Sequence, residues 1–398
     1  MVLLLALPLL LGILLGREQK STHRAWVEPI LALSSGLLSA IAATWWLAPQ
    51  HISVTWFETD FIDYCVGIEA MDNPHVTGPP KRSRAAGLLP YLAARQLGVL
   101  NGLALASVIS GGIIGAALFT WAHCLAGRMA ALFTLGVALC MGPMVAMTRM
   151  LNFYPEVIAG LVLGGAGCAA GISRRTPLAM LAGGGGAPIC LLVDVRGLVW
   201  ALVFLAGLLV AALAPAGGWK GRASRLGALV APVWLSWFGG WLAYPADANS
   251  LEQQIDVRPL YASFADFPAL GEQLTYPSRF VWGWTSPLDI PRTISWLLTQ
   301  ERTAVPQRYV EWKEQFEFLM PYVTGWGITG LVGLVIAVGI LGRGRPWQVL
   351  ALLVSAAPFA IAWWGTQSVV EPHLRFYAHG LPALAVALGV GGAGLADL

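Results

Sequence analysis

The chain has 398 residues, of which 57% are hydrophobic and only 11% are Asp, Glu, Lys or Arg, and its formal net charge is +3. An ordinary soluble domain carries roughly 25% charged residues, so a soluble fold could not bury this much apolar surface. The small net charge gives no sign of a nucleic-acid-binding surface either. The composition therefore excludes a soluble fold and indicates an integral membrane protein.

Apolar runs that end at charged residues recur along almost the whole sequence. A helix needs such a run to cross the ~30 Å hydrocarbon core of a bilayer, where the backbone must satisfy its hydrogen bonds within its own segment. We therefore predict an all-α polytopic membrane protein that forms a single domain over residues 1–398. The predicted spans, about eleven in number, are 2–16, 27–49, 100–122, 129–147, 157–173, 177–193, 197–215, 226–243, 323–341, 348–365 and 378–395.

Basic residues mark one side of this predicted bundle, where Glu18 is the only acid in the loops. By the positive-inside rule, that side is cytoplasmic. The large loops at 50–99 and 244–322 then face outward, and we expect short amphipathic helices in them. The predicted location is the inner (plasma) membrane, with the active site facing the periplasm or exterior. The basic residues are Arg17, Lys20, Arg24, Arg128, Arg174, Arg175, Lys220, Arg222, Arg225, Arg343 and Arg345.

Three acids, Glu58, Asp60 and Asp63, lie near the start of the first outer loop. Because they follow a predicted span, their carboxylates would lie close to the membrane surface. An ionised Asp at that depth can accept a proton from an acceptor hydroxyl. A solvated acidic loop would have the same spacing. The residues alone leave both interpretations open.

Cations follow in the same loop, where Lys81 and Arg82 come directly after two prolines and precede an apolar stretch. Positive charge on the outer side runs against the positive-inside trend. Lys and Arg bind phosphate oxygens strongly at a low-dielectric interface, so a lipid-phosphate substrate would explain them. Ordinary contact with lipid headgroups is the alternative.

Two further outer segments carry polar side chains beside predicted spans. Arg149, Tyr154 and Glu156 lie between two spans, where they would either line an outer cavity or cap a short loop. The last outer loop contains His373, Arg375 and Tyr377 just before the final span. Arg375 requires an anion at that depth, either a lipid phosphate or an acid from another loop.

In this order, the segments resemble the GT-C type membrane glycosyltransferases, especially the protein O-mannosyltransferases and the lipid A aminoarabinose transferases. The resemblance rests on Asp60 with Tyr64 in the first outer loop, the segment PPKRSRAAGLLP, Arg149 followed by Glu156, and the segment RFYAHGLPAL. Many members of the family continue beyond the final span. This chain ends soon after it, and we interpret it as a compact subfamily or an incomplete gene product.

The resemblance implies transfer of a sugar from a polyprenyl-phosphate donor to a lipid, glycan or protein acceptor, with inversion at the anomeric carbon. Asp60 would be the catalytic base and Glu156 a second acid. The donor phosphate would contact Lys81, Arg82, Arg149 and Arg375, and the cavity candidates are Asp63, Tyr64, His373 and Tyr377. We expect no required cofactor; a divalent metal is compatible with such a site, but no carboxylate or His cluster supports one beyond the first loop.

The main alternative is a secondary transporter or a lipid or glycolipid flippase. The glycine run 183–186 interrupts one predicted span, as a broken transporter helix would. Transporters also carry ionisable residues inside their spans, whereas the charges here lie at span ends and in loops. A non-catalytic glycolipid-binding relative is the third class, and it would tolerate loss of Asp60.

Overall fold

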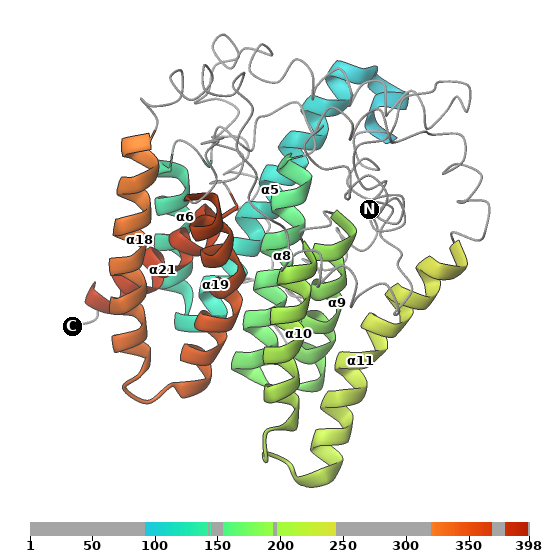
Figure 1. Cartoon of the computed structure of the whole chain (residues 1–398), viewed down its shortest axis with the longest axis vertical. Helices are drawn as coiled ribbons and strands as arrows, with labels where there is room; N and C mark the ends of the chain where they lie inside the picture. The colour runs from blue at the N-terminus through green and yellow to red at the C-terminus, as the bar shows by residue number, and fades with distance from the viewer. Residues whose placement is uncertain are drawn as a thin grey trace, which may run out of the picture.

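The computed structural model describes residues 92–141, 144, 154–193, 197–243, 320–367 and 379–396. All elements with assigned bounds in these ranges are α-helices that pack into one bundle (Figure 1). They are α5 (Val99–Ala126), α6 (Arg128–Cys140), α8 (Tyr154–Arg174), α9 (Pro177–Val193), α10 (Gly197–Leu213), α11 (Gly218–Ala243), α18 (Met320–Leu341), α19 (Pro346–Gln367) and α21 (Leu381–Ala396).

Each predicted span from residue 100 onward corresponds to one of these helices, and the all-helical prediction is confirmed for them. The spans predicted at 2–16 and 27–49 lie outside the described residues, as does nearly all of both large outer loops. Within the described ranges, Leu105–Ala126 and Tyr154–Arg174 are long and apolar enough to cross a membrane. Shorter apolar helices of 10–17 residues make up much of the remaining bundle.

Two predicted boundaries were wrong. The span predicted at 129–147 ends as helix α6 at Cys140, where Met141 leaves the helical conformation. At about 1.5 Å per residue, α6 is only about 20 Å long, which is too short to cross the ~30 Å hydrocarbon core unless the bilayer thins around it. The span predicted at 226–243 begins eight residues earlier, at Gly218, so basic residues assigned to a loop lie inside α11.

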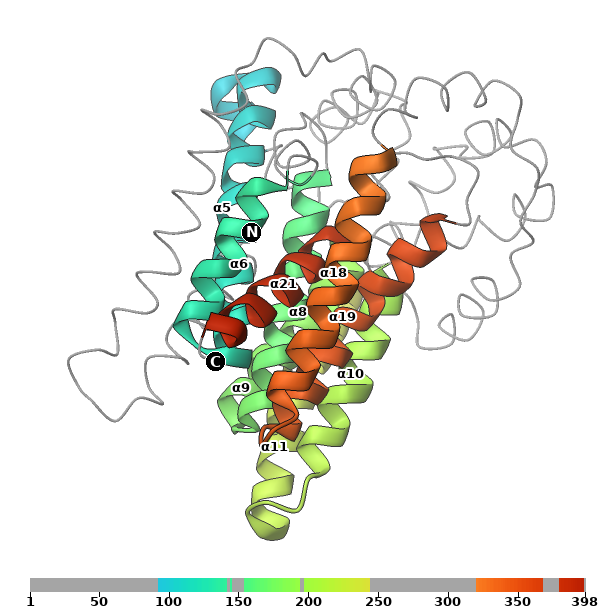
Figure 2. The ribbon, with the colours of Figure 1, turned by 90° about the vertical axis from the view of Figure 1, so that its left-hand side faces the viewer.

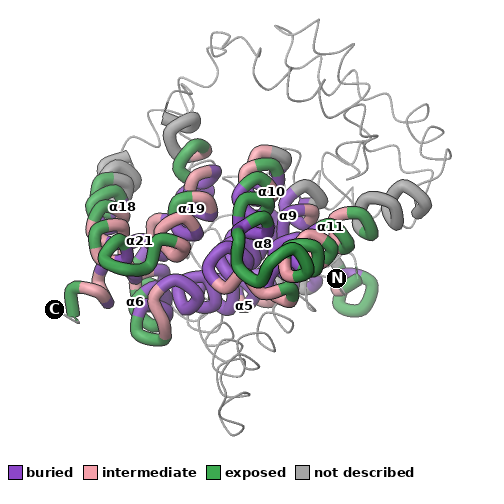
Figure 3. Tube along the Cα trace, turned by 90° about the horizontal axis from the view of Figure 1, so that it is seen from below, coloured by how far each residue is buried: buried purple, intermediate pink, exposed green. Residues whose placement is uncertain are grey.

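Helix α8 lies at the centre of the bundle, against α5, α9, α10 and α19. Its residues from Tyr154 to Ser173 are all buried. Seen from below, burial concentrates around α8, while α11 and α18 present exposed surface (Figure 3). The exposed side of α18 is apolar, with Ile328, Leu331 and Val335 each more than 60% exposed. Such a surface fits a chain whose surrounding solvent is lipid.

The glycine run 183–186 does not break α9, which is helical without interruption from Pro177 to Val193. The interruption predicted there was therefore wrong. A Cβ added at Gly167 of α8 would lie 2.8 Å from the carbonyl oxygen of Ala182, and one added at Gly184 would collide with the backbone of Leu229 in α11. The glycines thus let three helices approach closely, as small residues do at helix interfaces in membranes.

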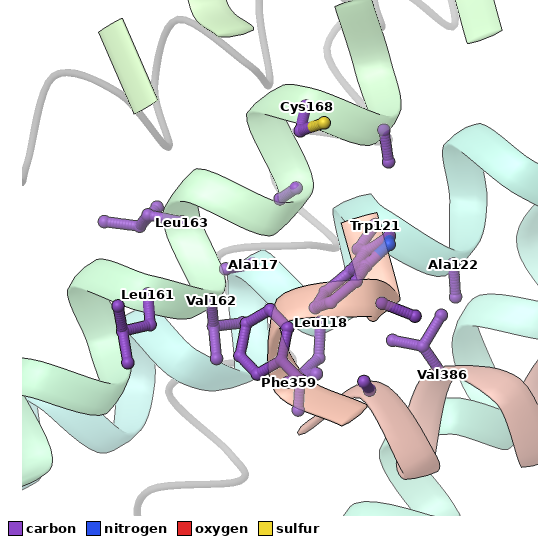
Figure 4. Packing of buried hydrophobic residues seen from close by; sticks show 14 of the residues in the cluster. Ala117, Leu118, Trp121, Ala122, Leu161, Val162, Leu163, Cys168, Phe359 and Val386 are labelled. Atoms are coloured by element: carbon purple, nitrogen blue, oxygen red, sulfur yellow. The ribbon is translucent and has the colours of Figure 1, made fainter. Parts of the chain in front are cut away.

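A hydrogen-bonded aromatic contact joins the first and last parts of the described bundle. The indole nitrogen of Trp121 in α5 donates a hydrogen bond of 2.8 Å to the hydroxyl of Ser355 in α19. The Trp121 and Phe359 rings pack with centroids 5.3 Å apart (Figure 4). Gly165 of α8 makes room, because a Cβ there would lie 2.8 Å from the Trp121 ring. This contact fixes α19 against α5 and α8.

Basic turns gather at one end of the bundle, where the α10–α11 and α18–α19 connections lie (Figures 1 and 2). Arg225 of α11 is buried and donates hydrogen bonds to the carbonyl oxygens of Ala212, Ala214 and Ala216 at 3.0, 2.6 and 2.8 Å. The last carbonyls of a helix have no partner within that helix. Arg225 therefore caps the end of α10 from within α11. This capping role gives a structural reason for one of the basic residues near the start of α11.

Replacing Arg225 by Met should lower the thermal stability of the purified protein. The change leaves up to three carbonyl oxygens without their charged donor, and each charge-assisted hydrogen bond contributes ~1.5–3 kcal/mol. The matched control is Arg222→Met, which removes the same charge from an exposed position of the same turn. Melting in detergent, followed by circular dichroism, should show a clear loss for Arg225→Met alone; equal melting temperatures would contradict the capping role.

Candidate functional site

Glu156 is the one predicted site residue that the structure describes. The others lie outside the described residues, and their grouping around one cavity stays a prediction. They are Asp60, Asp63, Tyr64, Lys81, Arg82, Arg149, His373, Arg375 and Tyr377.

The carboxylate of Glu156 is buried in the first turn of α8, with 3% of the residue exposed. The sequence placed Glu156 in a loop before the span, but the structure places it inside the helix. Within the described ranges it is the only acidic residue, and neither carboxylate oxygen has a hydrogen-bond partner there. A buried carboxylate without a partner is energetically costly. The N-terminal end of α8 compensates only in part, through its partial positive charge.

A chain of ring contacts leads from the start of α8 to three other segments. The ring of Tyr154 stands edge-on to His379, with centroids 6.4 Å apart. His379 also contacts Trp200 of α10 at 6.3 Å, and Trp200 stands at 90° to Phe359 of α19 at 5.6 Å. These contacts bring together the beginnings of α8 and α10 and the residue pair that precedes α21.

Three helices therefore begin at one place, and each contributes a partial positive charge from its free N–H groups. This place is the end of the bundle opposite the turns that carry Arg225 and the α18–α19 connection (Figure 1). Converging helix N-termini favour an anion such as a phosphate. The arrangement places these helix beginnings beside one buried carboxylate, Glu156, which can accept hydrogen bonds from hydroxyl groups.

Trp200 and His379 were not predicted as site residues. Both are buried, and the indole nitrogen of Trp200 has no hydrogen-bond partner among the described residues. Their signal in the sequence is weak, since Trp near a span end is common at membrane interfaces and a single His forms no motif. In the same ranges, no three His, Cys, Asp or Glu side chains gather as ligands of a metal ion would.

No protein-family model and no curated protein sequence matches this chain. Among solved structures, the oligosaccharyltransferase of Archaeoglobus fulgidus in its apo form superposes with a TM-score of 0.52 at 12% identity. The alignment covers 92% of this chain and 50% of that one. The same archaeal enzyme, AglB, in complex with an inhibitory peptide and a dolichol-phosphate gives a TM-score of 0.50 at 11% identity, covering 95% and 51%.

ArnT from Cupriavidus metallidurans bound to undecaprenyl phosphate aligns over 94% of this chain and 79% of that one, at 15% identity. The TM-score of that superposition is 0.35. This chain spans about half the length of the archaeal enzyme it matches. At such low identity the likeness concerns the fold alone. The chain has the GT-C fold of polytopic membrane proteins, as its sequence resemblance predicted.

Proposed function

We propose that this protein is an inverting glycosyltransferase that moves a sugar from a polyprenyl-phosphate donor to an acceptor at the outer membrane surface. The observation that carries the proposal is the GT-C fold, shared with an oligosaccharyltransferase over 92% of the chain. One structure of that archaeal enzyme contains dolichol-phosphate. By analogy, a polyprenyl phosphate is the lipid carrier proposed here.

In the proposed reaction, the acceptor hydroxyl or amine attacks the anomeric carbon from the face opposite the phosphate. The bond between the anomeric carbon and the phosphate oxygen breaks, and the phosphate keeps the electron pair. Asp60 takes the acceptor proton, as a positioned general base. A single displacement of this kind inverts the anomeric configuration.

The leaving phosphate needs stabilisation of its charge, and preorganised cations and dipoles supply it best in a site that excludes water. We assign this role to Lys81, Arg82, Arg149 and Arg375. The beginnings of α8, α10 and α21 add their partial charges, because the contacts among Tyr154, Trp200 and His379 hold them together. This convergence is independent support for an anionic substrate at this end of the bundle.

Glu156 is assigned the role of second acid. Its carboxylate has no hydrogen-bond partner among the described residues, so a ligand rich in hydroxyl groups would satisfy it. A sugar is such a ligand. In this assignment Glu156 orients the donor sugar or the acceptor, while Asp60 moves the proton.

Asp60→Asn should reduce sugar transfer by about 10²–10⁴-fold, the usual contribution of a general base. The change is nearly isosteric, so binding of the polyprenyl-phosphate donor should persist. The measurement is transfer of radiolabelled sugar from polyprenyl-phosphate donors by the purified full chain, with donor binding measured separately. Glu58→Gln, in the same loop, removes a charge without touching the proposed base and serves as the control.

Full activity of Asp60→Asn would remove Asp60 from the mechanism. If neither the wild type nor the control transfers sugar from any donor, while labelled substrate crosses vesicle membranes containing the protein, the transporter class is correct instead.

Glu156→Gln should lower transfer activity without lowering the melting temperature. A buried amide costs less than a buried carboxylate that lacks a partner, so stability should stay equal or rise. When a residue is kept for function at a cost to stability, its replacement lowers activity while the melting temperature stays equal or rises. Melting and transfer are measured on the same preparation; a loss of stability, or transfer equal to wild type, would show that Glu156 is a packing residue.

A further inference from the structure

Two basic turns that are far apart in the sequence meet at the end of the bundle opposite Glu156. The guanidinium carbon of Arg175, which follows α8, lies 4.3 Å from the ring centroid of Trp347 in the first turn of α19. A guanidinium stacked on an indole is held by cation–π attraction, and its N–H groups remain available at its edge. The Nε atom of Arg175 is buried and has no hydrogen-bond partner in the described part of the chain.

The backbone conformation of Arg175 is also unusual. Its φ is 55°, and no other non-glycine residue in the described ranges has a positive φ. Glycine would adopt this left-handed conformation without steric cost at the end of a helix. An Arg here places its side chain over Trp347 at the expense of backbone strain. The strain indicates that the position of the guanidinium matters.

The α18–α19 turn brings two more cations to the same place. Arg343 and Arg345 are both exposed. The carbonyl of Arg345 accepts hydrogen bonds from the backbone nitrogens of Gln348 and Val349, which puts Arg345 directly before the first turn of α19. It therefore lies within one helical turn of Trp347. No Asp or Glu within the described ranges lies at this end to neutralise these charges.

We propose that Arg175, Arg343 and Arg345, together with Trp347, bind the phosphate headgroup of an anionic phospholipid of the surrounding bilayer. Trp residues settle at the headgroup level of a membrane, which sets the depth of the site. Basic pockets between helices at this depth bind anionic headgroups. The site is independent of the proposed sugar transfer, because it lies at the other end of the bundle from Glu156.

The test compares retention of phosphatidylglycerol and phosphatidylcholine by the full chain in nanodiscs that contain both lipids, with bound lipid measured by native mass spectrometry. The double variant Arg343→Gln/Arg345→Gln should lose its preference for phosphatidylglycerol by about fivefold or more, because each cation near an anionic surface contributes measurably to binding. Lys220→Gln/Arg222→Gln removes the same charge from exposed positions near the start of α11. This control should keep the preference.

Equal losses in the two double variants would show that overall surface charge attracts the lipid, and would overturn the site. An unchanged preference in Arg343→Gln/Arg345→Gln would overturn it as well. A second variant, Arg175→Lys, keeps the charge but loses the planar stacking group. It should also reduce the preference for phosphatidylglycerol, while melting in pure phosphatidylcholine nanodiscs verifies that the fold is intact. Wild-type preference in this variant would count against the role of the Arg175–Trp347 contact.

Discussion

Helix α8 packs against four other helices, so its residues from Tyr154 to Ser173 are all buried. A helix buried on every side must present small side chains wherever another backbone approaches. In α8 this requirement explains Gly165, which faces the Trp121 ring, and Gly167, which faces the backbone of α9. Packing between small residues drives association where lipid already solvates apolar surface. The remaining described helices, α6, α11, α18 and α21, pack on the four helices that contact α8.

Against that background, Glu156 is an exception, since it is the one acid in a helix otherwise built for apolar packing. A burial cost without a partner among the described residues is expected at a functional site more than in a structural core. Glu156 also lies where three helices begin, so its charge and their dipoles act on the same volume. An anionic sugar donor and a hydroxyl-bearing acceptor suit this combination.

The two ends of the bundle differ in charge. One end has the turns with Arg175, Arg225 and Arg343, while the other holds Glu156 and the aromatic contacts of Trp200. Arg225 donates hydrogen bonds to carbonyl oxygens at and just beyond the end of α10, and its role is structural. Arg343 and Arg345 are exposed. The basic end therefore combines a structural cation with the proposed lipid site, and the opposite end holds Glu156, the described residue of the proposed transfer site.

Apolar run length alone predicted each described helix, because a bilayer imposes one thickness on every span. It failed at the ends of α6 and α11, where Met141 leaves the helix and Arg225 closes α10, since such local contacts have no apolar signal. The glycine run of α9 was also misinterpreted, because a run of glycines in a sequence looks the same whether the helix breaks there or another helix packs closely against it. The sequence by itself determined the helical class, the basic end and Glu156 as a candidate. Only the tertiary structure joined Trp200 to His379 and Arg175 to Trp347, because these pairs come from distant segments whose meeting depends on packing.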